Sequence, residues 1–174
     1  KLFKMMNLKF QYRAANINEK AVINLKNDKY DALKIAKAKA THLSKNNKNK
    51  IIITFDTTIL HMRKTIYKCH TKKCCKNTLK SFNNTSHNLY TGMVFMINNS
   101  LIRSSLTKTK IVFKKNKIID INKYVERNFN QISTAVGCYN VEGKGETFFK
   151  NIEKSYFNVI GIDIINFLKI LRSI

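Results

Sequence analysis

This sequence of 174 residues has no proline, no tryptophan, only five glycines and few acidic side chains. No Pro- or Gly-rich stretch separates one part of the chain from another, so we expect a single domain over residues 1–174 without a long linker. No apolar run approaches the roughly 18 residues of a membrane span, which argues against a membrane protein. The first residues lack the long apolar segment of a signal peptide, and we therefore expect a cytoplasmic protein.

The shortage of acidic side chains leaves the chain strongly basic, with 33 Lys and Arg against 10 Asp and Glu and a formal net charge of +23. One interpretation is a polyanionic partner, such as nucleic acid or a phosphorylated substrate. The other is a mutational bias toward AT-rich codons, which would also account for the abundance of Lys, Asn and Ile. The lysines are spread along the chain rather than gathered in one stripe, and this favours the compositional interpretation.

The chain has four cysteines, at positions 69, 74, 75 and 138, and no pair has the C-x-x-C spacing of a zinc knuckle or redox motif. Cys69, His70, Cys74 and Cys75 could in principle assemble a metal site. However, adjacent cysteines diverge along a backbone, and two lysines intervene. We therefore expect no zinc here, and reduced thiols.

An uncharged run, mostly β-branched or aromatic, extends from Ile51 to Phe55 and ends at Asp56. Such a run predicts a central strand that is buried on both faces. We expect Asp56 where that strand leaves the sheet, a position at which ligands gather in open α/β sheets. The alternative is that Asp56 caps a turn or a helix together with Thr57 and Thr58.

Residues 31–43 have the spacing of an amphipathic helix, and Asp31 suits its first turn. Lys39 does not fall on the polar side of this helix but projects between Ile35 and Ala32, within the apolar arc. A lysine in that position either extends past the edge of the core into water or points into an anionic site.

The remaining segments predict further helices and strands in an α/β protein. We expect helices over 72–82 and 164–171 and one around residues 148–152. Strands are expected over 90–97, 101–113, 136–141 and 156–160, with a hairpin turn at residues 98–100.

Short motifs follow one another along nearly the whole chain: Ala15-Asn16-Ile17-Asn18-Glu19, Ile35-Ala36-Lys37-Ala38-Lys39-Ala40, Asp56-Thr57, Lys68, His87 with Thr91-Gly92, Thr109-Lys110-Ile111-Val112-Phe113, and Gly137-Cys138-Tyr139-Asn140-Val141-Glu142-Gly143. Their order and intervals resemble those of the Maf family of nucleoside triphosphate pyrophosphatases. The resemblance implies an α/β fold, a mixed twisted sheet with flanking helices whose two lobes enclose a central cleft, and chains that often pair as homodimers.

The resemblance also implies an activity, which is hydrolysis of a nucleoside triphosphate between its α- and β-phosphates with a divalent cation, Mg²⁺ or Mn²⁺. Asp56 would be the general base, with possible metal contact, and Glu19 would orient the metal or the water. Lys39 and Lys68 would hold phosphate oxygens. Thr57 would belong to the part of the site that selects the base.

Glu142 would be the second residue tied to base selectivity. The pyrimidine-preferring branch of that family has glutamine at the corresponding position, whereas glutamate there resembles the branch associated with 7-methyl-GTP. The sequence also departs from the family pattern. Its N-terminal S-x-S-x-R phosphate loop is absent, and Lys154 and Asp163 stand where the family has a glycine and a proline. Two alternatives therefore stay open, a catalytically decayed relative and a basic nucleic-acid-binding protein.

Overall fold

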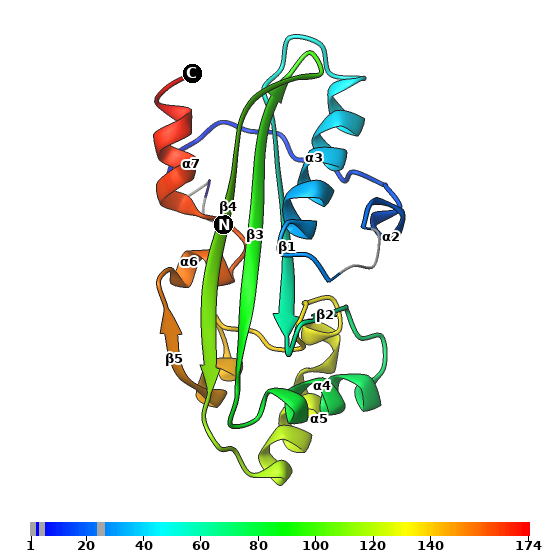
Figure 1. The fold of residues 1–174 in the computed structure, drawn as a ribbon, viewed down its shortest axis with the longest axis vertical. Coiled ribbons are helices and arrows are strands. Elements are labelled where there is room, and N and C mark those ends of the chain that lie inside the picture. The colour runs from blue at the N-terminus through cyan, green and yellow to red at the C-terminus, as the bar shows by residue number, and fades with distance from the viewer. Residues whose placement is uncertain (1–2, 4–5, 24–26) are drawn as a thin grey trace.

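The computed structural model describes residue 3 and residues 6–23 and 27–174. Its centre is a five-stranded sheet in the order β2-β1-β3-β4-β5, in which each neighbouring pair of strands is antiparallel (Figure 1). The strands are β1 (Ile52–His61), β2 (Lys64–Ile66), β3 (Ser86–Ile97), β4 (Ser100–Phe113) and β5 (Phe149–Glu153). The helices are α2 (Glu19–Val22), α3 (Asp31–Ser44), α4 (Lys72–Phe82), α5 (Ile118–Ile132), α6 (Tyr156–Val159) and α7 (Ile164–Leu171), with a 3₁₀ helix over Lys144–Phe148.

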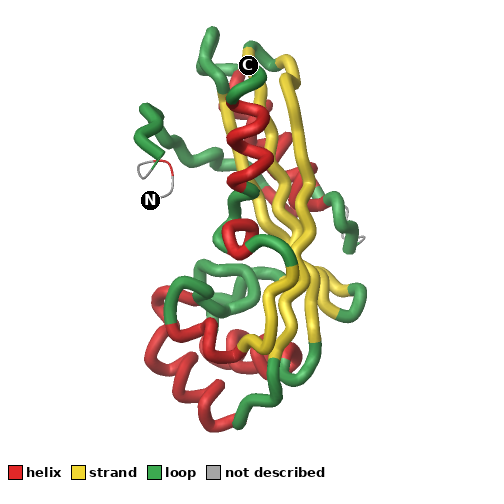
Figure 2. The backbone as a smooth tube through the Cα atoms, turned by 90° about the vertical axis from the view of Figure 1, so that its left-hand side faces the viewer, coloured by secondary structure: helices red, strands yellow, loops and turns green. Residues whose placement is uncertain are grey.

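Two lobes share the long strands β1, β3 and β4, so the expected α/β fold is confirmed. In the upper lobe of Figure 1, α3 and α7 cover opposite faces of the sheet (Figures 1 and 2). In the lower lobe, α4 and α5 pack together against the other end of the strands, where the largest group of buried apolar side chains lies.

The long hairpin of β3 and β4 turns at Asn98 and Asn99, as predicted. Both residues have left-handed φ angles, of 48° and 62°. Asparagine tolerates this conformation better than most residues, and two such residues match the twist of the flanking strands.

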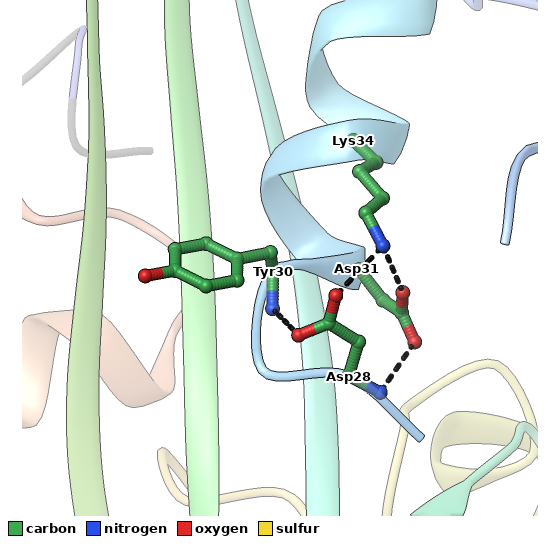
Figure 3. A network of polar contacts seen from close by, with 4 residues as sticks. All are labelled: Asp28, Tyr30, Asp31 and Lys34. Carbon is green, nitrogen blue, oxygen red and sulfur yellow. Dashed lines mark hydrogen bonds and ion pairs between the residues drawn. The ribbon is translucent and has the colours of Figure 1, made fainter. Parts of the chain in front are cut away.

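The start of α3 is held by a small polar network (Figure 3). The carboxylate of Asp28 accepts a hydrogen bond from the backbone N–H of Tyr30 at 3.0 Å, and the N–H of Asp28 donates to the carboxylate of Asp31 at 3.2 Å. The Nζ atom of Lys34 lies 2.8 Å from Asp28 and 3.4 Å from Asp31. These contacts define where the helix begins, and with it the positions of the side chains one and two turns later.

Asp56 lies in the middle of β1, not at its end, so the predicted position of this residue is wrong. Pairing of β1 with β3 continues through the residue, from Ile52 opposite Met96 to Leu60 opposite Asn88. The threonines and isoleucine that follow Asp56 favour the extended conformation, which keeps the strand going. The carboxylate is tolerated there because a lysine pairs with it, as described below.

Three predictions for the last third of the chain are also wrong. Residues 136–141 do not form a strand, because Gly137 and Cys138 have φ angles of 86° and 59°, which a strand does not allow. Residues 149–153 form β5 rather than a helix, and residues 156–159 form α6 rather than a strand. The side chain of Ser155 accepts a hydrogen bond from the N–H of Asn158 and so caps α6.

The expectation of four reduced thiols is wrong for two of them. Cys69 and Cys74 form a disulfide, with Cα atoms 5.5 Å apart, whereas Cys75 and Cys138 are free thiols and buried. The turn between β2 and α4 brings Cys69 back onto the first turn of α4, which sequence spacing alone did not indicate.

Candidate active site

Lys39 lies between two acidic side chains that come from distant parts of the chain. Its Nζ atom is 2.6 Å from Oδ1 of Asp56 and 2.6 Å from Oε1 of Glu19. The lysine therefore points into an anionic site, which was one of the two alternatives for its place in the apolar arc. The side chains of Lys39 and Asp56 are mostly buried, with 18% and 12% of their surface exposed.

Close packing of α3 on the sheet makes this contact possible. Gly92 lies directly opposite Asp56 in the β1–β3 pairing, and a Cβ atom on Gly92 would come within 2.6 Å of backbone atoms of Ala32 and Leu33. The hydroxyl of Thr54, two residues before Asp56 and on the same face, donates to the carbonyl oxygen of Ala36 at 2.7 Å. Glycine is thus required at position 92 for α3 to approach the sheet.

Burial and ion pairing shift the pKa values of Asp56 and Lys39. Burial raises the pKa of Asp56, and this outweighs the hydrogen bond from Lys39, which acts to lower it. Burial acts to lower the pKa of Lys39, but the hydrogen bonds to Asp56 and Glu19 outweigh it, and the pKa is raised. A carboxylate that is more basic than an ordinary aspartate, beside a permanently charged amine, suits proton transfer.

Lys68 belongs to the same region but is not part of this ion-paired group. It is exposed on the segment between β2 and α4, next to Cys69 of the disulfide. Its charge acts on Asp56 over distance and lowers the pKa of that carboxyl, more weakly than Lys39 does. A second amine therefore lies within electrostatic range of the acid.

Thr57 and Glu142 lie together in a different place. They line a cavity of about 330 Å³ on the other face of β1, where the two lobes meet. The remaining lining residues are Leu89, Gln131, Ala135, Val136, Tyr139, Asn140, Val141, Val159, Ile160 and Gly161. Successive residues of a strand point to opposite faces, so Asp56 and Thr57 are separated by the thickness of one strand.

The open edge of β1 connects the ion-paired group around Lys39 with the cavity lined by Thr57 and Glu142. Strand β2 pairs with β1 only over residues 59–61, so β3 is the one strand partner of Ile52–Thr58 in the part of the chain that the structure describes. The residue pair Asp56 and Thr57 therefore lies at an edge of the sheet. A ligand that crosses this edge can reach the acidic group on one face and the cavity on the other.

Sequence reasoning did not identify the residues that hold the cavity in place. The hydroxyl of Thr57 lies 3.1 Å from that of Thr91, which donates to the backbone oxygen of Asn158 at 3.1 Å. Asn158 is fully buried, and its amide donates to the Thr109 hydroxyl at 2.9 Å. Thr91 and Thr109 belong to motifs quoted above, whereas no local pattern marks Asn158.

The carboxylates of Glu19 and Asp56 fit a hard divalent cation. Both are oxygen donors of the kind that Mg²⁺ and Mn²⁺ prefer, and both lie 2.6 Å from the same nitrogen atom. Two carboxylates and one amine leave a net negative charge at this point, which favours a cation.

No helix among the described residues is long and apolar enough to cross a membrane.

Comparison with known proteins identifies a family and several relatives. A family model described as Maf-like protein matches residues 1–174. The chain is similar to a dTTP/UTP pyrophosphatase of Thermosipho melanesiensis, with 29% identity over 163 residues that cover 94% of this chain and 85% of the relative. Proteins of the same name from Clostridium botulinum strain Okra and Lacticaseibacillus casei are 27% and 25% identical, over 89% and 93% of this chain and 81% and 86% of the relatives.

Proposed function

Because the chain belongs to the family of Maf-like proteins, we propose that it is a nucleoside triphosphate pyrophosphatase. It hydrolyses the bond between the α- and β-phosphates and releases a nucleoside monophosphate and pyrophosphate. The observation that carries this proposal is the placement of Lys39 at 2.6 Å from both Glu19 and Asp56, beside a strand edge that leads to a cavity.

In this proposal Asp56 acts as the general base. It takes a proton from the water that attacks the phosphorus atom, and its position within a paired strand keeps the carboxylate in one place. Lys39 and Lys68 contact phosphate oxygens as point charges and neutralise part of the charge of the triphosphate. Glu19 and Asp56 would hold Mg²⁺ or Mn²⁺, which supplies further neutralisation of phosphate charge when bound.

Thr57 and Glu142 contact the base in the cavity on the other face of β1. The relatives named dTTP/UTP pyrophosphatases support thymidine and uridine triphosphates as the first substrates to test. The carboxylate of Glu142 supports 7-methyl-GTP as the second, because it accepts hydrogen bonds and attracts a cationic methylated purine. Pairing into a homodimer and a location in the cytoplasm stay predictions from the sequence.

Replacement of Asp56 tests the proposal. We expect Asp56→Asn to lower pyrophosphate release by roughly 10²–10⁴-fold, because the amide cannot accept the proton. Pyrophosphate would be measured on the purified full chain with Mg²⁺ or Mn²⁺. Asp120→Asn, an exposed acid in the first turn of α5, is the matched control and should leave the rate unchanged. No pyrophosphate from any ordinary or modified triphosphate would contradict the proposal and favour a decayed relative.

Replacement of Glu142 tests the base selectivity. We expect Glu142→Gln to raise the rate ratio of UTP to 7-methyl-GTP by roughly tenfold, because glutamine can donate as well as accept and carries no charge. The ratio of kcat/KM values for the two substrates measures this. Glu146→Gln, four residues later and exposed, is the control and should not change the ratio. An unchanged ratio in Glu142→Gln would show that this residue does not contact the base.

A further inference from the structure

Three of the four cysteines, Cys69, Cys75 and Cys138, gather at one point of the lower lobe, although Cys138 is far from the other two in sequence. The Sγ atoms of Cys69, Cys75 and Cys138 all lie within 4.8 Å of one another, and the three residues are buried. The fourth sulfur, of Cys74, is bonded to Cys69. No other group of three or more possible metal ligands lies this close together within residues 3, 6–23 and 27–174.

Three different elements supply these sulfurs. Cys69 lies on the segment after β2, Cys74 and Cys75 lie in the first turn of α4, and Cys138 lies in the turn after α5. The adjacent residues Cys74 and Cys75 do diverge along the backbone, as expected. However, Cys69 lies between them, so that the sulfur of each is close to the sulfur of Cys69. The objection to a metal site at adjacent cysteines therefore does not hold for this fold.

The spacing of the sulfurs is close to that of a thiolate metal site. Zinc–sulfur bonds of about 2.3 Å in a tetrahedron place neighbouring sulfurs roughly 3.8 Å apart. The three buried sulfurs need to approach one another by about 1 Å or less to reach that geometry. We propose that, when the Cys69–Cys74 disulfide is reduced, Cys69, Cys75 and Cys138 bind a zinc-class cation with Cys74 as the fourth ligand.

The start of α4 positions two of the four proposed ligands. Cys74 and Cys75 lie in the first turn of this eleven-residue helix. The N–H of Cys74 donates to the side chain of Thr71, and the N–H of Cys75 donates to its carbonyl oxygen. These bonds fix the turn that carries two of the four ligands.

The disulfide and the metal exclude each other, because Cys69 cannot serve both. An external dithiol opens the site when it attacks the disulfide, so that the Cys69–Cys74 bond breaks, two thiols form and the dithiol is oxidised to its own disulfide. Zinc then displaces the thiol protons, which pass to solvent. No further oxidant or reductant is required.

The site ties together two segments of the proposed active site. Cys69 follows Lys68, the second amine near Asp56, and Cys138 precedes Tyr139, which lines the cavity. A bound cation would therefore hold the phosphate-binding segment against the base-binding segment. This role is structural and separate from the hard cation proposed at Glu19 and Asp56.

Metal analysis of the full chain tests the inference. The chain is reduced with a phosphine, incubated with zinc alone and desalted, and metal is counted by mass spectrometry. We expect about one zinc ion per reduced chain and none in the chain kept as the disulfide. Cobalt in place of zinc should give the thiolate charge-transfer bands of a tetrahedral site. A reduced chain without zinc, or equal binding by the disulfide form, would overturn the inference.

Single variants identify the ligands. Cys75→Ser and Cys138→Ser should lose the bound zinc, whereas His70→Asn, next to Cys69, should keep it. If the two serine variants retain zinc, the metal is held elsewhere and the inference fails. If they do not fold, the cobalt spectrum of the unmodified chain still decides, because only thiolate ligands give those bands.

Two further variants separate the remaining parts of the inference. Cys74→Ser should bind zinc more weakly, and unchanged binding would remove Cys74 as the fourth ligand. Asp56→Asn should keep one zinc per chain while pyrophosphate release is lost. The zinc site and the proposed activity can therefore fail independently of each other.

Discussion

Lys154 shows how a single residue can carry backbone strain. It follows β5 with a φ of 85°, in the left-handed region that favours glycine. The Maf family pattern described above implies a glycine at this position, and the positive φ of Lys154 gives a physical reason for that preference. The strain arises because the Cβ atom of any residue other than glycine crowds its own backbone in this conformation.

We therefore expect Lys154→Gly to raise the free energy of unfolding, because it removes a strain of about 1 kcal/mol. The greater entropy of glycine in the unfolded chain offsets part of this gain. Urea denaturation would measure the difference. Lys150→Gly, within β5, makes the same chemical change at a residue that does not have a positive φ, and it should destabilise by about 0.5–1 kcal/mol. A lower stability of Lys154→Gly would show that the side chain contributes more than the strain removes.

The contact between α3 and the sheet is the element-scale feature on which the candidate site depends. Gly92 leaves room for the backbone of the first turn of α3, and the Thr54 hydroxyl bonds to that helix one turn later. Lys39 reaches Asp56 only because the helix lies this close. The position of the amine is therefore set by a glycine on a different element.

We expect Gly92→Ala to destabilise the protein by about 1–3 kcal/mol, because the added methyl group meets backbone that cannot move without shifting the helix. Pyrophosphate release should fall as well, since α3 carries Lys39. Thermal unfolding and the hydrolysis rate would measure the two effects. Gly143→Ala is the control, because its new Cβ meets only the flexible side chain of Asn140 at 3.3 Å or more. Equal effects of the two variants would contradict the role given to Gly92.

At the scale of the whole molecule, one buried histidine links stability to pH. Burial lowers the pKa of His87 to about 3, and the neighbouring His61 acts in the same direction. The Nε2 atom of His87 lies 2.9 Å from the Tyr139 hydroxyl oxygen in the core of the lower lobe, packed against the ring of Phe82. The neutral ring is therefore part of the core, and its protonation is coupled to unfolding.

Between about pH 3 and pH 6.5 the unfolded chain binds a proton at this residue and the folded chain does not. The free energy of unfolding therefore rises with pH across this window and is lost as the pH falls, by up to roughly 5 kcal/mol in total. We expect His87→Gln to flatten this slope, measured as urea midpoints at several pH values. His42→Gln, exposed on α3, is the control and should keep the slope of the unmodified protein. An equal slope in His87→Gln would contradict the linkage.

The candidate site also depends on the arrangement of the whole molecule. The group around Asp56 and the cavity lined by Thr57 lie on opposite faces of β1, where the two lobes meet. Alternation along a strand separates Asp56 from Thr57 automatically. Asp56 and Thr57 are adjacent in the sequence, and the sequence alone did not indicate that their side chains lie on opposite faces of the sheet.

The sequence by itself determined the α/β class, the β3–β4 hairpin, the helices α3, α4 and α7 and the family. Periodicity, turn residues and motif order are properties of the amino-acid order, so they can be recognised without the three-dimensional structure. It also singled out Lys39 as a lysine in an apolar arc. Only the tertiary structure decided that Asp56 lies within a strand, that Gly92 admits α3, that residues 136–141 turn and that Cys138 joins Cys69 and Cys75. These features depend on contacts between segments far apart in the chain, and such contacts leave no periodic or spacing signal in either segment alone.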